Sequence, residues 1–147
     1  MEWFKEKVIG KKDLNADITR VCINPKDSHL VSTSGPNHWR TWRIEEKSFK
    51  DQPLISKLAQ TQNFTDHDWI DDDTAVAVTD MSEIFISRDN QIIKYFEFGF
   101  GNLTGSNLAN ASITCITGFS RGFIITSDEG HLAIYEHTET NDFEEQI

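Results

Sequence analysis

Five aspartates and one histidine lie within eight residues of this sequence, in the segments 66–68 and 71–73. Carboxylate oxygens suit Ca²⁺ or Mg²⁺, and an imidazole suits Zn²⁺, so these residue types could bind a metal. The ligands would be the carboxylates of Asp66, Asp68, Asp71 and Asp73. The spacing lacks the alternating ligands, central glycine and distal glutamate of an EF-hand. In a strand, moreover, Asp66 and Asp68 would share one face and the histidine between them would point to the other. We therefore expect a strand end and a solvated acidic hairpin, with metal binding as the weaker alternative.

Nucleophilic catalysis needs a Ser or Cys beside a base and an orienting carboxylate. No nucleophile-elbow motif surrounds any serine of the chain. The segment Gly99-Phe100-Gly101 lacks the third glycine and the following helix of a phosphate-binding loop. A catalytic base would have to come from the five histidines, of which three lie beside turns and one near the C-terminal end. These histidines are His29, His38, His67, His131 and His137. The sequence therefore predicts neither an enzyme nor a cofactor.

The charge balance narrows the choice of partners. The formal net charge is −10 and the pI about 4.8. Nucleic acids and anionic membranes attract chains of the opposite sign. No apolar run approaches the roughly 18 residues of a membrane span, and Cys22 and Cys115 are too few for a disulfide framework. We expect a reducing, cytosolic compartment and protein partners, with no nucleic acid and no membrane.

Short runs rich in β-forming residues, bounded by turn residues, dominate the sequence and occur in three groups. The first group is 18–23, 30–33 and 39–44; the second is 64–70, 74–79, 84–86 and 91–96; the third is 113–117, 123–126 and 132–135. Only 54–60 has helical character, and it is so short that we expect a loop with at most one helical turn.

The three groups recur with a period typical of propeller blades. Aligning their third runs places Trp42, Ile86 and Tyr135 in register, at spacings of 44 and 49 residues. Blades of the WD-repeat type repeat every 40–45 residues or so, and the Gly/Asn/Ser-rich segment 99–107 accounts for the longer spacing. The expected blades are 16–55, 62–98 and 111–138, followed at 139–147 by an acidic tail or the start of a next blade.

Apolar residues occupy both faces of the expected strands, as in Ala75-Val76-Ala77-Val78, which is typical of a sheet stacked between other sheets. The predicted fold is therefore all-β: a WD-repeat-like β-propeller of about three blades, each a four-stranded antiparallel sheet. Closed propellers have at least four blades, so the propeller would be partial and would need blades from the same or a companion chain. Trp3-Phe4-Lys5 is consistent with the end of an earlier blade's strand. The alternative is a self-contained β-sandwich of nine or ten strands.

The order of these segments resembles a known family. The segment from Val21 to Ile44 looks like a WD-repeat unit, in which Trp42-Arg43 stands where the Trp-Asp pair would be, so the aspartate is missing. The second unit, from His67-Asp68-Trp69 to Asp80 and Ile86, resembles a stretch of axonemal WD-repeat proteins, with Ala77 in place of an expected glycine. The third unit and the opening residues are also similar. These relatives are the cilia- and flagella-associated proteins of the inner-dynein-arm adaptor type.

The resemblance implies a non-enzymatic scaffold. Such proteins lie on ciliary doublet microtubules and help to position inner dynein arms and regulatory complexes. The implied partners are inner-arm dynein subunits and regulatory and tether complexes, and the implied location is the cytoskeleton of the cilium or flagellum. The motif residues implied to be structural are Trp42, His67, Trp69, Asp80 and Tyr135. The alternative function is a self-contained β-domain that binds a divalent ion or small ligand at the cluster from Asp66 to Asp73.

Overall fold

Three four-stranded antiparallel sheets follow one another along the chain, each a simple meander. The computed structural model describes residues 7–98, 111–137 and 143–146. Blade 1 consists of β1 (Arg20–Ile23), β2 (Leu30–Gly35), β3 (His38–Glu45) and β4 (Ser48–Asp51). Blade 2 consists of β5 (Phe64–Trp69), β6 (Thr74–Thr79), β7 (Glu83–Arg88) and β8 (Gln91–Glu97). Blade 3 consists of β9 (Ile113–Phe119), β10 (Gly122–Ser127), β11 (Leu132–His137) and β12 (Phe143–Gln146).

Two of the hairpin turns show why the chain reverses where it does. Glu46 and Lys47 have φ values of 49° and 65°, and Asp89 and Asn90 have values of 51° and 62°. Two consecutive residues with positive φ form the turn whose twist matches that of the flanking strands. The first turn creates the β3–β4 hairpin, so β4 is the fourth strand expected in blade 1, although no β-rich run of the sequence had identified its residues.

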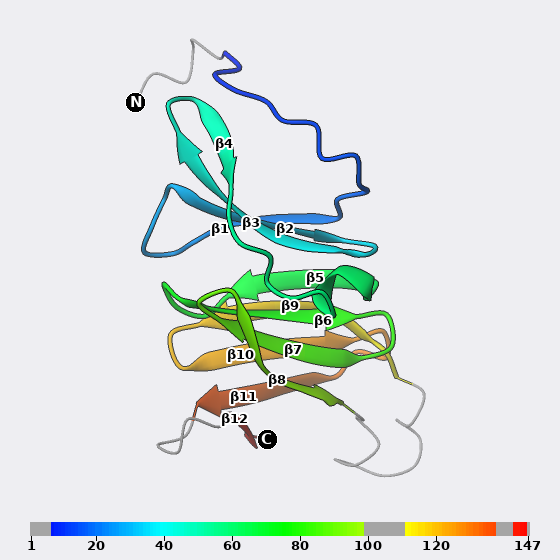
Figure 1. Cartoon of the computed structure of the whole chain (residues 1–147). Helices are drawn as coiled ribbons and strands as arrows, with labels where there is room; N and C mark the ends of the chain where they lie inside the picture. The colour runs from blue at the N-terminus through cyan, green and yellow to red at the C-terminus, as the bar shows by residue number, and fades with distance from the viewer. Residues whose placement is uncertain (1–6, 99–110, 138–142, 147) are drawn as a thin grey trace.

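The sheets stack face to face (Figure 1). The first strand of each blade is its innermost strand, the one closest to the first strand of the next blade. β5 contacts β1 and β2 on one side and β9 on the other, so the first strands of the three blades lie beside one another. This is the arrangement of blades around a propeller axis. The predicted all-β, partial-propeller fold is confirmed. Residues 143–146, assigned from sequence to a tail or a next blade, form the outermost strand of blade 3.

Each blade has an N-side face, directed toward the blade before it in sequence, and a C-side face, directed toward the blade after it. In blade 2, Ala77 and Phe85 lie on the N-side face and pack with blade 1, whereas Val78 and Ile84 lie on the C-side face and pack with blade 3. All six residues of β6 are buried. The expectation that apolar residues on both faces of 75–78 mark a sandwiched sheet is therefore confirmed.

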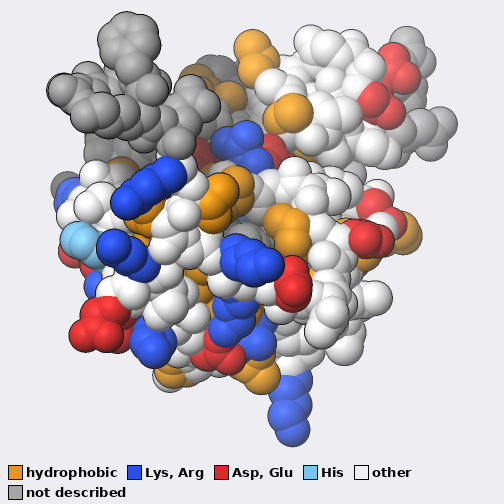
Figure 2. Space-filling view, turned by 90° about the horizontal axis from the view of Figure 1, so that it is seen from above, with side chains coloured by type: hydrophobic (Ala, Val, Ile, Leu, Met, Phe, Trp, Pro, Cys, Tyr) orange, Lys and Arg blue, Asp and Glu red, His pale blue; other side chains and the backbone are white. Residues whose placement is uncertain are grey.

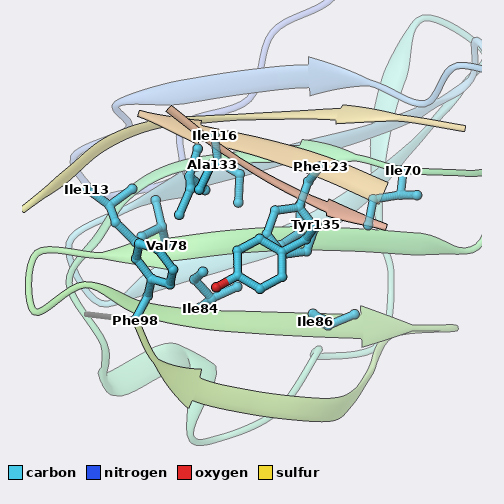
Figure 3. Packing of buried hydrophobic residues seen from close by; sticks show 12 residues of the cluster. Ile70, Val78, Ile84, Ile86, Phe98, Ile113, Ile116, Phe123, Ala133 and Tyr135 are labelled. Atoms are coloured by element: carbon cyan, nitrogen blue, oxygen red, sulfur yellow. The ribbon is translucent and has the colours of Figure 1, made fainter. Parts of the chain in front are cut away.

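The larger core lies between blades 2 and 3 (Figure 3). Tyr135 and Phe123 of blade 3 stack with ring centroids 4.9 Å apart, and the figure places both rings against the aliphatic side chains of blade 2. Phe98, which follows β8, packs edge-on against Tyr135 at 5.7 Å. Burial of this much apolar surface is the main contribution that holds the two sheets together.

The linker between blades 1 and 2 also contributes to the core. Ile55 and Ala59 are buried between the two sheets, and the 3-10 helix η1 (Ala59–Thr61) supplies the single helical turn expected there. The predicted strand end at Trp3-Phe4 and the segment 99–107 lie outside the described residues.

One register prediction is wrong by a single residue. Trp42 lies on the N-side face of blade 1 and Tyr135 on the N-side face of blade 3, but Ile86 lies on the C-side face of blade 2. The residue of blade 2 that matches the other two is Ser87, because it pairs with Ala75 as Tyr135 pairs with Phe123. Because neighbouring residues of a strand face opposite ways, a shift of one residue exchanges the faces.

Candidate functional site

The innermost strand of blade 2, β5, forms polar contacts with both neighbouring blades. His67 is fully buried, and its ring lies between two serine hydroxyls of β2. Ser32 Oγ is 2.6 Å from Nε2 and Ser34 Oγ is 2.5 Å from Nδ1. The thiol of Cys22 donates to the His67 carbonyl oxygen at 3.4 Å. Burial lowers the pKa of His67 to about 4 and raises that of Cys22, so at neutral pH both side chains are uncharged.

The aspartates on either side of His67 point the opposite way, toward blade 3. The Ile116 amide donates to Asp66 Oδ2 at 2.9 Å, and the Gly118 amide donates to Asp68 Oδ2 at 2.8 Å. The Thr117 hydroxyl adds a hydrogen bond to Asp68 at 3.2 Å. Carboxylates that accept backbone N–H groups form charge-assisted hydrogen bonds, which are stronger than neutral ones. The alternation predicted for these three residues thus directs His67 to blade 1 and the hydrogen bonds of the two aspartates to blade 3, while Asp66 also forms an ion pair with Arg20 of blade 1 at 3.5 Å.

The other two candidate metal ligands, Asp71 and Asp73, lie in separate contacts. Asp71 forms an ion pair with Lys26 of the β1–β2 loop at 2.5 Å, which lowers the pKa of the Asp71 carboxyl. Asp73 accepts a hydrogen bond from the Thr74 hydroxyl at 2.8 Å. Among the described residues, no three His, Cys, Asp or Glu side chains are grouped so that they could hold a metal ion.

Trp42 forms a second polar network within blade 1. Its indole N–H donates to the Thr33 hydroxyl at 2.9 Å, and that hydroxyl is 2.7 Å from His38 Nε2. The cations of Lys12 and Arg40 lie 4.8 and 4.9 Å from the centre of the indole ring, within the range of cation–π attraction. Blade 1 thus lacks the aspartate after Trp42 but contains a buried polar network of Trp42, Thr33 and His38.

The remaining motif residues occupy packing positions. Trp69 is buried in the junction of blades 1 and 2, and within the described chain its indole nitrogen has no hydrogen-bond partner. Asp80 ties the β6–β7 turn to the linker before β5, because its carboxylate accepts a hydrogen bond from the Asn63 amide at 2.8 Å. Tyr135 lies in the core between blades 2 and 3. None of the three lines the groove on blade 1 that is described next.

A shallow apolar groove lies on the N-side face of blade 1. Its volume is about 130 Å³. The lining residues are Lys12, Leu14, Val21, Val31, Thr33, Trp42 and Phe49. Viewed from this end, Lys and Arg side chains surround hydrophobic ones (Figure 2). This groove was not predicted from the sequence, because it forms where Lys12 and Leu14, which precede β1, meet side chains of the sheet.

The fold and these junctions define a segment of a β-propeller. A crystal structure of the Cps50 (Swd1) β-propeller domain from Myceliophteria thermophila matches the chain with a TM-score of 0.66 and 13% sequence identity. The match covers 90% of this chain and 43% of that one, so the chain spans less than half the length of that domain. No family model matches the chain, and no curated protein matches it. In the part of the chain that the structure describes, no helix is long and apolar enough to cross a membrane.

Proposed function

We propose that this chain is a non-enzymatic, WD-repeat-type module that binds other proteins. The observation that carries this proposal is the two sets of polar contacts that β5 makes, one with each neighbouring blade. His67 bonds backward to blade 1 and Asp66 and Asp68 bond forward to blade 3, so the three sheets are held at fixed angles. A rigid stack of this kind presents its connecting loops in a constant arrangement, and binding residues concentrate on such loops.

We further propose that the module belongs to a scaffold of the ciliary axoneme that helps to position inner dynein arms and their regulatory complexes. Support comes from the resemblance of the segment from His67 to Asp80 to axonemal WD-repeat proteins. The charge of the chain adds a constraint on its partners. With a net charge of −10, it would be repelled by the acidic tails of tubulin, so its partners would be proteins with basic patches.

Co-sedimentation tests this proposal with two microtubule preparations as matched controls. The purified chain is mixed either with axonemal doublets that retain their dynein bases or with microtubules of pure tubulin. We expect it to sediment with the doublets and to stay in the supernatant with pure tubulin. Equal binding to both preparations, or no binding to doublets, would refute the axonemal assignment. The proposal of a protein-binding module would then need a different partner.

A further inference from the structure

The N-side face of blade 1 is built like the interior junctions of the molecule. At each interior junction, the segment that precedes a blade packs between that blade and the one before it. Ile55 and Ala59 do this before β5, and Phe98 does it before β9. Before β1, Lys12 and Leu14 occupy the corresponding place on blade 1 and line the groove with Trp42, although no described residue covers them from outside.

The open face is apolar where an interior junction would bury it. Val21 and Ile23 of β1 are each 61% exposed, and they lie on the same side of the sheet as Val31 and Trp42. In blade 3 the corresponding N-side residues are buried by aliphatic side chains from blade 2. By the same geometry, the groove over Trp42 would accept valine or isoleucine side chains from the C-side face of another blade.

The C-side face of blade 3 offers such side chains. Ile124 and Ile134 are directly paired on β10 and β11, and Leu132 lies one pair further along the same face. Leu132 is 71% exposed and Ile134 39% exposed. In blade 2, the position of Ile124 is held by Val76, which is buried against blade 3.

The two ends of the sequence also differ in charge. Residues 7–51 carry nine Lys and Arg against six Asp and Glu, a net charge of +3. Residues 111–147 carry one arginine against seven Asp and Glu, a net charge of −6. Lys12 and Arg40 flank the groove over Trp42, where both also pair with Asp51, and within the described residues the buried Nε of Arg40 has no hydrogen-bond partner. The basic end of one molecule would therefore attract the acidic end of another.

From these observations we propose that two copies of this chain associate head to tail. The C-side face of blade 3 of each copy docks on the N-side face of blade 1 of the other. A head-to-tail contact that repeats and closes forms a ring, and the three described blades of each of two copies make six, within the four to eight of known propellers. The inference goes beyond the proposed function and does not depend on it.

The interior junction predicts which residues meet across the new one. Asp66 Oδ2 lies 2.9 Å from the Ile116 amide. By strand pairing, Cys115 holds in blade 3 the position of Asp66, and Val21 holds in blade 1 the position of Ile116. Cys115 is an exposed free thiol. A Val21→Cys variant should therefore form an intermolecular disulfide with Cys115 under mild oxidation.

Light scattering after size exclusion, and non-reducing gels, test the proposal. We expect a mass of twice the 16.8 kDa monomer, and a covalent dimer from Val21→Cys. The double variant Val21→Cys/Cys115→Ser should give a much weaker dimer band, as should Met81→Cys, which places a thiol in an exposed turn away from both faces. A monomer at every concentration, or equal cross-linking of all three variants, would overturn the proposal and leave the open face for blades of a different protein.

Charge substitutions give an independent test in which folding is not at risk, because the altered side chains are exposed. Ile23→Glu and Leu132→Glu should each be monomeric, since each disrupts both junctions of the ring. A mixture of the two should form a one-to-one heterodimer, because one of its junctions contains only unaltered faces. Dimerisation of either variant at the level of the parent chain would contradict the proposed contact.

Discussion

The stability of the protein should fall on mild acidification, and the largest contribution should come from His67. Burial holds the pKa of this imidazole at about 4, whereas in the unfolded chain it is about 6.5. Below pH 6.5 the unfolded state therefore takes up a proton that the native state does not bind, and the native state loses stability as the pH falls toward 4. Between pH 7 and pH 5 the linkage amounts to about 2 kcal/mol.

The matched variant is His67→Gln, which retains hydrogen-bonding groups but does not titrate. Urea unfolding at both pH values can be followed by tryptophan fluorescence, since Trp39 and Trp69 are buried in the junction of blades 1 and 2. His38, whose pKa is also lowered by burial, contributes to the pH dependence of both proteins and cancels in the comparison. We expect the parent to lose about 2 kcal/mol more than the variant between pH 7 and pH 5.

The variant will be less stable than the parent at pH 7, so the result is read from the change with pH and not from the absolute values. If the two proteins lose equal free energy between pH 7 and pH 5, within the error of the extrapolation, His67 does not titrate as its burial between Ser32 and Ser34 requires. His67 would then not be held buried between blades 1 and 2 in solution.

Three further predictions concern the junction of blades 2 and 3, each checked by urea unfolding. Asp68→Asn should lower the free energy of unfolding by about 1–2 kcal/mol, because the charge-assisted hydrogen bond from the Gly118 amide is weakened. Asp72→Asn, in an exposed turn, should change it little. Equal effects of the two substitutions would contradict the contact between Asp68 and blade 3. Gly118→Ala should cost about 1–3 kcal/mol, because an added Cβ would lie 1.9 Å from the Trp69 carbonyl oxygen; an unchanged midpoint would mean that the strands can separate freely. Phe123→Ala should cost about 3–5 kcal/mol through the cavity left in the core, and a loss below 1 kcal/mol or so would show that the blades repack.

Most of the strands could be predicted from the sequence, because β-branched runs between turn residues are a local signal. The run 74–79 matches β6 at both ends, and its apolar residues on both faces correctly indicated a sheet between sheets. Four strands were expected in each blade, but the residues of two of them were not identified, namely β4 (Ser48–Asp51) and β12 (Phe143–Gln146). Both are short and polar, and they are strands because a neighbouring strand offers them an edge to pair with, which a sequence pattern does not contain.

The candidate site could also be predicted only in part. The opposite orientation of His67 and its two aspartate neighbours follows from strand geometry alone and was predicted. Their partners are backbone amides and serine hydroxyls of strands far away in the sequence, so the spacing of residues could not identify them. The one-residue register error at Ile86 has a related cause, since the facing of a strand in its blade is set by the neighbouring sheet and not by its own residues.

The segment that packs in front of each blade also bears on how such a molecule can be rebuilt. Ile55 and Ala59 belong in sequence to a connection, yet they are buried as deeply as the strands they precede. A duplicated, deleted or transplanted blade would therefore have to begin in the connection, a dozen or so residues before the innermost strand, and end with the outermost one. Cuts made just before that strand would leave a stack whose sheets no longer fit. The modular unit for engineering longer or shorter propellers from this chain is a blade together with the connecting segment that precedes it.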